Sequence, residues 1–147
     1  MTYVILIYIS AITASVSEAN MLMPCEVTVK SVVPSIRSAI AKELTETYGL
    51  KQKEVAHLLG VTQTAVSKYT RHVRGTVLEI EGIEEVRPIV KETVVLLANG
   101  RISRYELAGR FCRMCEIIRR KRLLCELCKR SDPSIDIQKC FVCMQER

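Results

Sequence analysis

Residues 52–72 read QKEVAHLLGVTQTAVSKYTRH, and this stretch predicts two short helices joined by a tight turn. Gly60 stands at the corner, where the chain needs a positive φ that glycine adopts at little cost. Thr62 follows as an N-cap for the second helix. The positions that turn inward at helical spacing are small or apolar: Val55, Ala56, Leu59, Val66 and Tyr69. The spacing is that of a bihelical unit whose second helix lies in the major groove of DNA.

The outward positions of this unit are polar or basic, and they are the predicted DNA-binding residues. Gln63 suits bidentate pairing with adenine, and Lys68 suits guanine or a phosphate. Thr64 and Ser67 have short side chains that suit contact with a thymine methyl or a phosphate. Arg71 and Arg74, near the helix end, suit phosphates, and phosphate contacts position the protein on DNA without reading its sequence. The complete predicted set is Gln52, Thr62, Gln63, Thr64, Ser67, Lys68, Arg71 and Arg74.

A further helix is predicted over residues 34–48, with Pro34 in its first turn and Gly49 as its stop. Its apolar face consists of Ile36, Ile40, Leu44 and Tyr48. Residues 34–75 resemble the phage-repressor (Cro/cI-like, XRE) helix-turn-helix family. The wider run 24–75, PCEVTVKSVVPSIRSAIAKELTETYGLKQKEVAHLLGVTQTAVSKYTRHVRG, is similar to the N-terminal domain of an archaeal group of predicted transcriptional regulators.

In that archaeal group the domain also occurs fused to a thiamine-phosphate-synthase-like domain. A cysteine-rich segment stands in its place here, so the vitamin-linked role does not carry over. The resemblance implies double-stranded DNA as the partner of residues 24–75. A homodimer is expected too, because one recognition helix covers few bases and helix-turn-helix proteins commonly bind two half-sites.

The charge is distributed unevenly along the 147 residues, whose formal net charge is +6. Residues 30–75 hold eight Lys/Arg against three acids, and residues 101–130 hold ten against three. Between them, residues 76–100 hold two against five. The basic blocks favour a polyanionic partner, with a solvated basic surface as the alternative. The 48% hydrophobic and 26% charged content is that of a globular protein and excludes a disordered one.

Residues 76–100 predict a connector with a helix from about residue 87 to 98, opened by Pro88. Val90, Val94 and Leu97 form an apolar stripe along it. This stripe packs either against the helix-turn-helix core or against a second copy of the chain, and the sequence leaves both open.

Three Cys-x-x-Cys pairs follow within residues 101–147: Cys112/Cys115, Cys125/Cys128 and Cys140/Cys143. The first lies on a helix predicted from about residue 104 to 120, opened by a Ser103–Glu106 capping box. Two intervening residues let both thiolates reach one metal ion. Four thiolates suit zinc or a [4Fe–4S] cluster, so all six cysteines are candidate ligands and two exceed the need.

Other uses of the thiols compete with the metal. Reduced cysteines pack like small hydrophobic residues in a core, although core packing does not produce three identical spacings. In a dithiol oxidoreductase the Cys-x-x-Cys motif lies in a βαβ unit. The periodicity around the motifs here predicts helices and no βαβ unit. Cys25 stands apart from the pairs and is expected to pack in the core, with completion of a site formed between the folded modules as the alternative.

Residues 1–23 form an apolar leader without Lys or Arg. Its nearly all apolar run, residues 2–16, is short for a membrane-spanning helix, and a signal peptide would need a positive start. Translation from Met21 or Met23 explains the leader best, with a membrane anchor and a signal peptide as alternatives.

The expected fold is all-α. A DNA-binding domain at 24–75 is joined by a connector at 76–100 to a metal-binding helical module at 101–147. The expected function is that of a cytoplasmic, sequence-specific transcriptional regulator that responds to metal or redox state. It is not expected to be an enzyme or to take a small-molecule substrate. The alternative is a scaffold or antitoxin-like helix-turn-helix protein that binds other proteins and holds a structural zinc.

Overall fold

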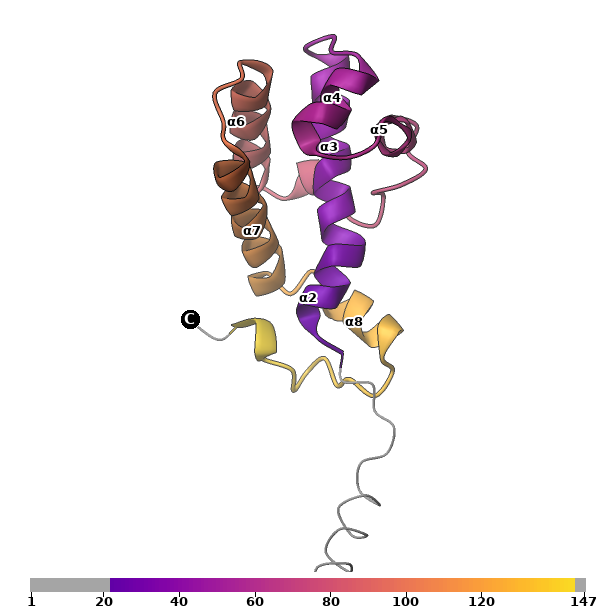
Figure 1. Ribbon diagram of the computed structural model, residues 1–147. Helices are drawn as coiled ribbons and strands as arrows, with labels where there is room; N and C mark the ends of the chain where they lie inside the picture. The colour runs from indigo at the N-terminus through magenta and orange to yellow at the C-terminus, as the bar shows by residue number, and fades with distance from the viewer. Residues whose placement is uncertain (1–21, 145–147) are drawn as a thin grey trace, which may run out of the picture.

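The computed structural model describes residues 22–144, which are mainly helical and contain no β-strand (Figure 1). The all-α class expected from the sequence is confirmed for these residues. The leader expected at 1–23 lies outside the described residues except for Leu22 and Met23. In the described part of the chain, no helix combines the length and the apolar character needed to cross a membrane.

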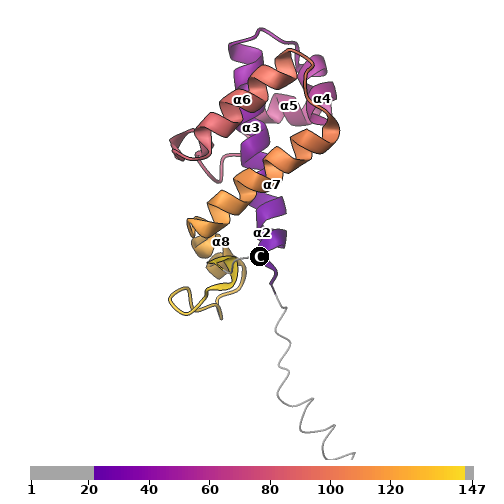
Figure 2. The same ribbon diagram turned by 90° about the vertical axis from the view of Figure 1, so that its left-hand side faces the viewer.

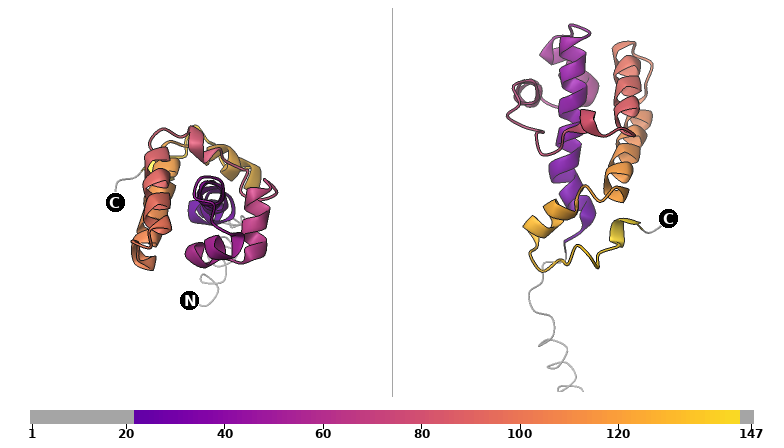
Figure 3. Two further views of the ribbon diagram at one scale, coloured as in Figure 1. Left: turned by 90° about the horizontal axis from the view of Figure 1, so that it is seen from above. Right: turned by 180° about the vertical axis from the view of Figure 1, so that it is seen from behind.

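One long helical rod runs through the centre of the molecule (Figure 3). It consists of α2 (Pro24–Val27), the π-helical η1 (Thr28–Val32) and α3 (Val33–Glu46). Pro34 lies in the first turn of α3, as predicted, but the chain is already helical before it. Proline lacks an N–H and crowds the carbonyl one turn back, so a regular α-helix cannot pass through it unchanged. The wider π turn absorbs this, and the Val33 N–H donates to the carbonyl of Thr28, five residues earlier.

The apolar face of α3 forms the middle of the core. Ile36, Ile40 and Leu44 have no exposed surface, as their spacing predicted. Tyr48 was expected on the same face, but this prediction is wrong because α3 ends at Glu46 and Tyr48 is 40% exposed. The chain then turns at Gly49, whose φ is +64°.

Helices α4 (Gln52–Leu59) and α5 (Gln63–Thr70) pack against each other and against α3. Gly60 takes the left-handed conformation at the end of α4, with φ +64°. The Thr62 hydroxyl accepts a hydrogen bond from the Ala65 amide at 3.1 Å and so caps α5. All five inward residues predicted from the sequence are buried.

Helices α6 (Arg87–Ala98) and α7 (Arg104–Arg120) have the bounds that the sequence indicated. The short η2 (Ile80–Gly82) precedes α6 and packs against α3. The α6 stripe of Val90, Val94 and Leu97 is buried, and α6 packs directly on α3. Within the chain, the stripe therefore covers the central helix.

The buried apolar residues form one continuous cluster from Val27 to Leu124. Seen along the rod, α3 stands in the middle, with α4 and α5 on one side and α6 and α7 on the other (Figure 3). Residues 24–75, 76–100 and the part of 101–147 up to Leu124 all contribute to this single core.

The chain after Leu124 differs from the rest. It contains α8 (Cys125–Ser131) and the 3₁₀ turn η3 (Val142–Met144). Helix α8 packs against α2 and η3 packs against α7, at the opposite end of the molecule from α4 (Figure 2). No residue from 125 to 144 is buried. We call residues 125–144 the tail.

Candidate nucleic-acid interface and cysteine cluster

The side chains of helix α5 divide into a buried face and an exposed face. Val66 and Tyr69 point into the core, with 0% and 1% of their surface exposed. Gln63, Thr64 and Lys68 are exposed on the other face, and Ser67 is half-buried. Among residues 22–144, neither the Gln63 amide nor the Lys68 ammonium group has a hydrogen-bond or ion-pair partner. The outer face of α5 therefore presents free polar groups on a helix whose inner face is fixed.

Two contacts hold α5 in this orientation. The Ser38 hydroxyl of α3 donates to the Tyr69 carbonyl at 3.4 Å. The Gln52 amide, at the start of α4, donates to the Thr70 hydroxyl at 3.5 Å. Gln52 was predicted to contact DNA, and here one of its two amide hydrogens ties α4 to the end of α5.

The basic residues at the end of α5 are exposed. Arg71 donates from Nε to the Ser67 carbonyl at 3.2 Å, so its side chain follows the helix. The Arg74 guanidinium lies over the Tyr69 ring, 5.9 Å from its centroid. Both Arg71 and Arg74 keep guanidinium N–H donors exposed to solvent, next to the polar face of α5. His57 and His72 are exposed as well.

The structure divides the six paired cysteines into two groups. Cys112 and Cys115 lie on α7, where Cys112 is exposed and Cys115 belongs to the hydrophobic core with 9% exposure. The other four line one cavity of about 310 Å³ between α8, η3 and the ends of α2 and α7: Cys125, Cys128, Cys140 and Cys143. Neither Cys112 nor Cys115 lines this cavity.

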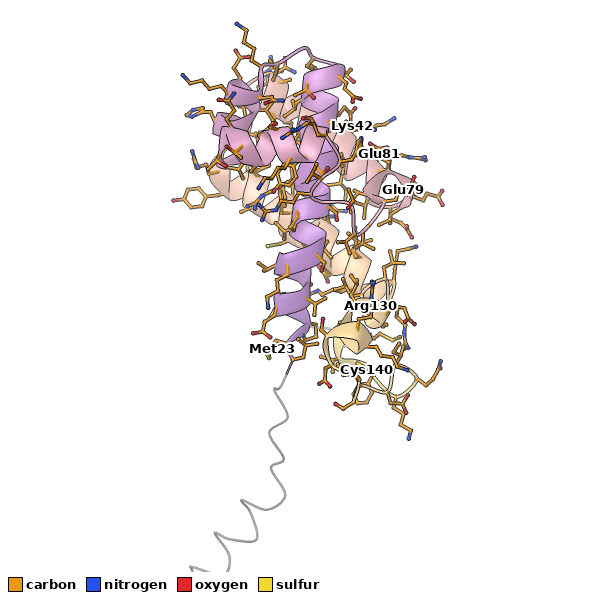
Figure 4. The ribbon with its side chains drawn as sticks, turned by 90° about the vertical axis from the view of Figure 1, so that its right-hand side faces the viewer. Met23, Lys42, Glu79, Glu81, Arg130 and Cys140 are labelled. Atoms are coloured by element: carbon orange, nitrogen blue, oxygen red, sulfur yellow. The ribbon has the colours of Figure 1, made fainter. Side chains whose placement is uncertain are left out.

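The rest of the cavity wall is mostly apolar. Leu22, Met23 and Pro24 contribute from the start of the described chain, and Ile135 and Ile137 from the loop after α8. Figure 4 shows Met23 and Cys140 at this end of the molecule, away from Lys42 and Glu81. The polar exceptions on the wall are two cations, Arg119 and Arg122.

Arg122 joins the end of α7 to the tail. Its φ of +60° places it in the left-handed region, where a non-glycine residue is uncommon. Its guanidinium donates to the Ile137 carbonyl and lies 3.8 Å from the Met144 sulfur. The sequence showed only a run of basic residues at 119–122, and nothing in that run distinguished Arg122 from its neighbours.

The cavity thiols influence one another's ionisation. Burial raises the pKa of Cys128, and the neighbouring thiols of Cys143, Cys125 and Cys140 raise it further. Burial also raises the pKa of Cys143, whereas the charge of Arg119 lowers it. On α7, burial first and then the neighbouring Cys112 raise the pKa of Cys115 to about 11, although the charge of Arg119 acts to lower it. Cys115 is therefore a protonated thiol at neutral pH.

Within the described range, no group of three or more His, Cys, Asp or Glu side chains already stands in a metal-ligand arrangement. Metal binding by the six cysteines, as zinc or as an iron–sulfur cluster, therefore stays a prediction. The expectation for Cys25 was wrong: it is exposed, because the buried side of the first helical turns is occupied by Val27 and Thr28.

Comparisons of the chain with protein-family models, with curated proteins and with solved structures found no match.

Proposed function

We propose that this protein is a sequence-specific DNA-binding transcriptional regulator and that α5 is the helix that enters the major groove. The observation that carries the proposal is the outer face of α5, where Gln63 and Lys68 have no partner among the described residues, opposite a face that is buried in the core. An α-helix fits the major groove, where base edges present distinct patterns of donors and acceptors.

The chemistry of the face supports base reading at two positions. Gln63 is in the first turn of α5, and the N-terminal part of a recognition helix commonly contacts base edges. Its exposed amide offers one acceptor and two donors, the pattern that adenine complements. Lys68 lies just over one turn further along and adds a cation that has no partner among the residues that the structure describes.

The surroundings supply the electrostatic part of DNA binding. Arg71 and Arg74 follow the face directly, and residues 30–75 carry the excess of basic over acidic residues noted above. Cations near a reading helix bind phosphates and bring most of the affinity, which is why such binding depends on salt. A homodimer would place two copies of α5 on successive half-sites.

The test is selection of binding sites from a random pool of duplex DNA with the full chain, followed by affinity measurements at several salt concentrations. We expect an enriched motif and an association constant that falls steeply as salt rises. Sedimentation of the complex on the selected duplex would show whether two chains bind.

A matched control separates the α5 face from general surface charge. The variant Gln63→Ala/Lys68→Ala should lose the sequence preference, whereas Gln138→Ala/Lys139→Ala removes the same two residue types from the exposed tail and should keep it. If the wild-type chain selects no motif, or if both variants behave alike, the reading role of α5 is wrong. The alternative of a protein-binding scaffold would then be favoured.

A further inference from the structure

The tail has no core of its own, and of its side chains only Leu127 and Cys128 pack, partly buried, against the main core. No side chain in residues 125–144 is buried, and neither α8 nor η3 contributes a buried residue. Ordering the backbone costs about 1–2 kcal/mol per residue, and apolar burial is the usual compensation. Since this segment buries so little, its arrangement calls for another source of stabilisation.

The thiols of four cysteines line one cavity where the tail folds back, although among the described residues they do not yet stand in a metal-ligand arrangement. Cys125 and Cys128 are three residues apart in α8, which puts them on the same side of the helix. Cys140 and Cys143 lie on the approach to η3 and within it, and they face the same cavity. Because each pair comes from a different arm of the tail, a group bound by all four would join the two arms.

We infer that Cys125, Cys128, Cys140 and Cys143 form a four-thiolate site for a thiophilic metal centre, either a zinc ion or a [4Fe–4S] cluster, and that Cys112 and Cys115 do not take part. Both centres need four cysteine ligands. The bound centre would take the place of a hydrophobic core in the tail, as metals do in other small domains. This inference goes beyond DNA binding and does not depend on it.

The wall of the cavity suits such a centre. Four thiolates around Zn²⁺ or around a [4Fe–4S]²⁺ core leave a net charge of about −2. Arg119 and Arg122 are the cations that line the cavity, and Arg122 is already held against the tail by the Ile137 carbonyl. The remaining wall is apolar, and the polarity of the surroundings tunes metal affinity and redox potential.

Metal binding at this site releases a fixed number of protons. Each thiol must lose its proton before its sulfur binds a metal, so four metal–sulfur bonds form as four protons leave to solvent. No oxidant or reductant is needed for zinc. A cluster would bind through the same four thiolates.

The experiment uses the full chain, produced with zinc and iron supplied and purified without oxygen in the presence of a reductant. Metal analysis, acid-labile sulfide and visible absorbance distinguish the two centres. We expect either about one zinc per chain in a colourless protein, or four irons and four sulfides in a brown protein that bleaches in air.

Alkylation read out by mass spectrometry identifies the ligands in the wild-type protein. The four cavity cysteines should be protected while the metal is bound and should react once a chelator has removed it. Cys112 should react in both states. Protection of Cys112 together with the cavity cysteines would overturn the inference, and so would the absence of any protection that depends on metal.

Three double variants complete the test. Cys125→Ala/Cys128→Ala and Cys140→Ala/Cys143→Ala should each lose the metal, whereas Cys112→Ala/Cys115→Ala should keep it. Cobalt(II) titration of the reduced, metal-free wild-type chain gives a readout independent of variant folding, since thiolate-to-cobalt bands report the number of sulfur ligands. Bands of fewer than four thiolates, or metal loss confined to the Cys112/Cys115 variant, would contradict the proposed site. None of these measurements involves DNA, so their failure would leave the role of α5 standing.

Discussion

Gly75 lies against Pro34 so closely that a β-carbon added at Gly75 would stand 2.4 Å from the Pro34 carbonyl oxygen. The same atom would lie 2.7 Å from Cβ of Ser38, one turn further along α3. Real β-carbons essentially never approach another heavy atom this closely. Glycine at position 75 therefore lets the chain leaving α5 turn back directly onto the central helix.

The variant Gly75→Ala should destabilise the fold more than left-handed strain by itself does. Gly75 has a φ of +77°, and alanine would carry both that strain and the clash with the backbone of Pro34. We expect a loss of at least about 2 kcal/mol in the free energy of unfolding. Gly100→Ala is the matched control, because Gly100 has a φ of +62° and open space around it. The control should lose only about 1 kcal/mol. Equal losses in urea denaturation would contradict the close contact.

The α6 stripe offers a comparison between adjacent valines. Val94 is fully buried against the core, whereas Val95 is 45% exposed. Val94→Ala should lower the free energy of unfolding by about 2 kcal/mol, through lost burial and the cavity left behind. Val95→Ala should change it by less than about 0.5 kcal/mol. Similar effects at both positions would mean that α6 does not pack on α3 as described.

The two kinds of predicted DNA contact should separate in binding assays. Gln63→Ala should reduce the preference for the selected motif by about 1–3 kcal/mol while leaving binding to unrelated duplexes nearly unchanged. Arg74→Ala should instead weaken binding to all sequences alike and lower the dependence on salt. Arg130→Ala, which removes an exposed arginine at the far end of the molecule, should do neither. If Gln63→Ala leaves specificity intact, another part of the surface reads the bases.

The buried thiol of Cys115 should make stability fall at high pH. Its pKa is raised from 9.0 to about 11, first by burial and then by Cys112. A folded-state pKa above the unfolded value stabilises the protein below the unfolded value, and this contribution is lost as pH rises from about 9 toward about 11. The difference in unfolding free energy between wild type and Cys115→Ala should therefore shrink across that range. Alkylation gives a direct check: exposed Cys112 should react at neutral pH, and Cys115 should react slowly until the chain opens.

The local signals in the sequence were reliable for helix positions. Pro88 and the Ser103–Glu106 capping box lie at the starts of α6 and α7, and both helices have the predicted bounds. Gly60 and Thr62 likewise defined the junction of α4 and α5. These residues act through their own backbone or through partners a few positions away, so a single sequence shows their effect.

The errors arose where burial depends on distant segments. Periodicity put Tyr48 on the inner face of α3, but the helix stops before it and the side chain is exposed. Cys25 looked like a core residue from its chemistry, and the packing of the first helical turns leaves it outside. The helical start at Pro24 was missed because Pro34 is a common helix opener, and here a π turn carries the helix past it.

The sequence by itself determined the bounds of α6 and α7, the junction of α4 and α5 and the outward face of α5, because helical period and capping are properties of neighbouring residues. It also showed three Cys-x-x-Cys pairs, but their identical spacing could not indicate which pairs belong to one site. Only the tertiary structure placed α6 on α3, buried Cys115 and brought Cys125 and Cys128 to the same cavity as Cys140 and Cys143. The physical reason is that the reversal of the tail and its contact with Arg122 involve residues far apart in the chain, and such contacts exist only once the core has formed.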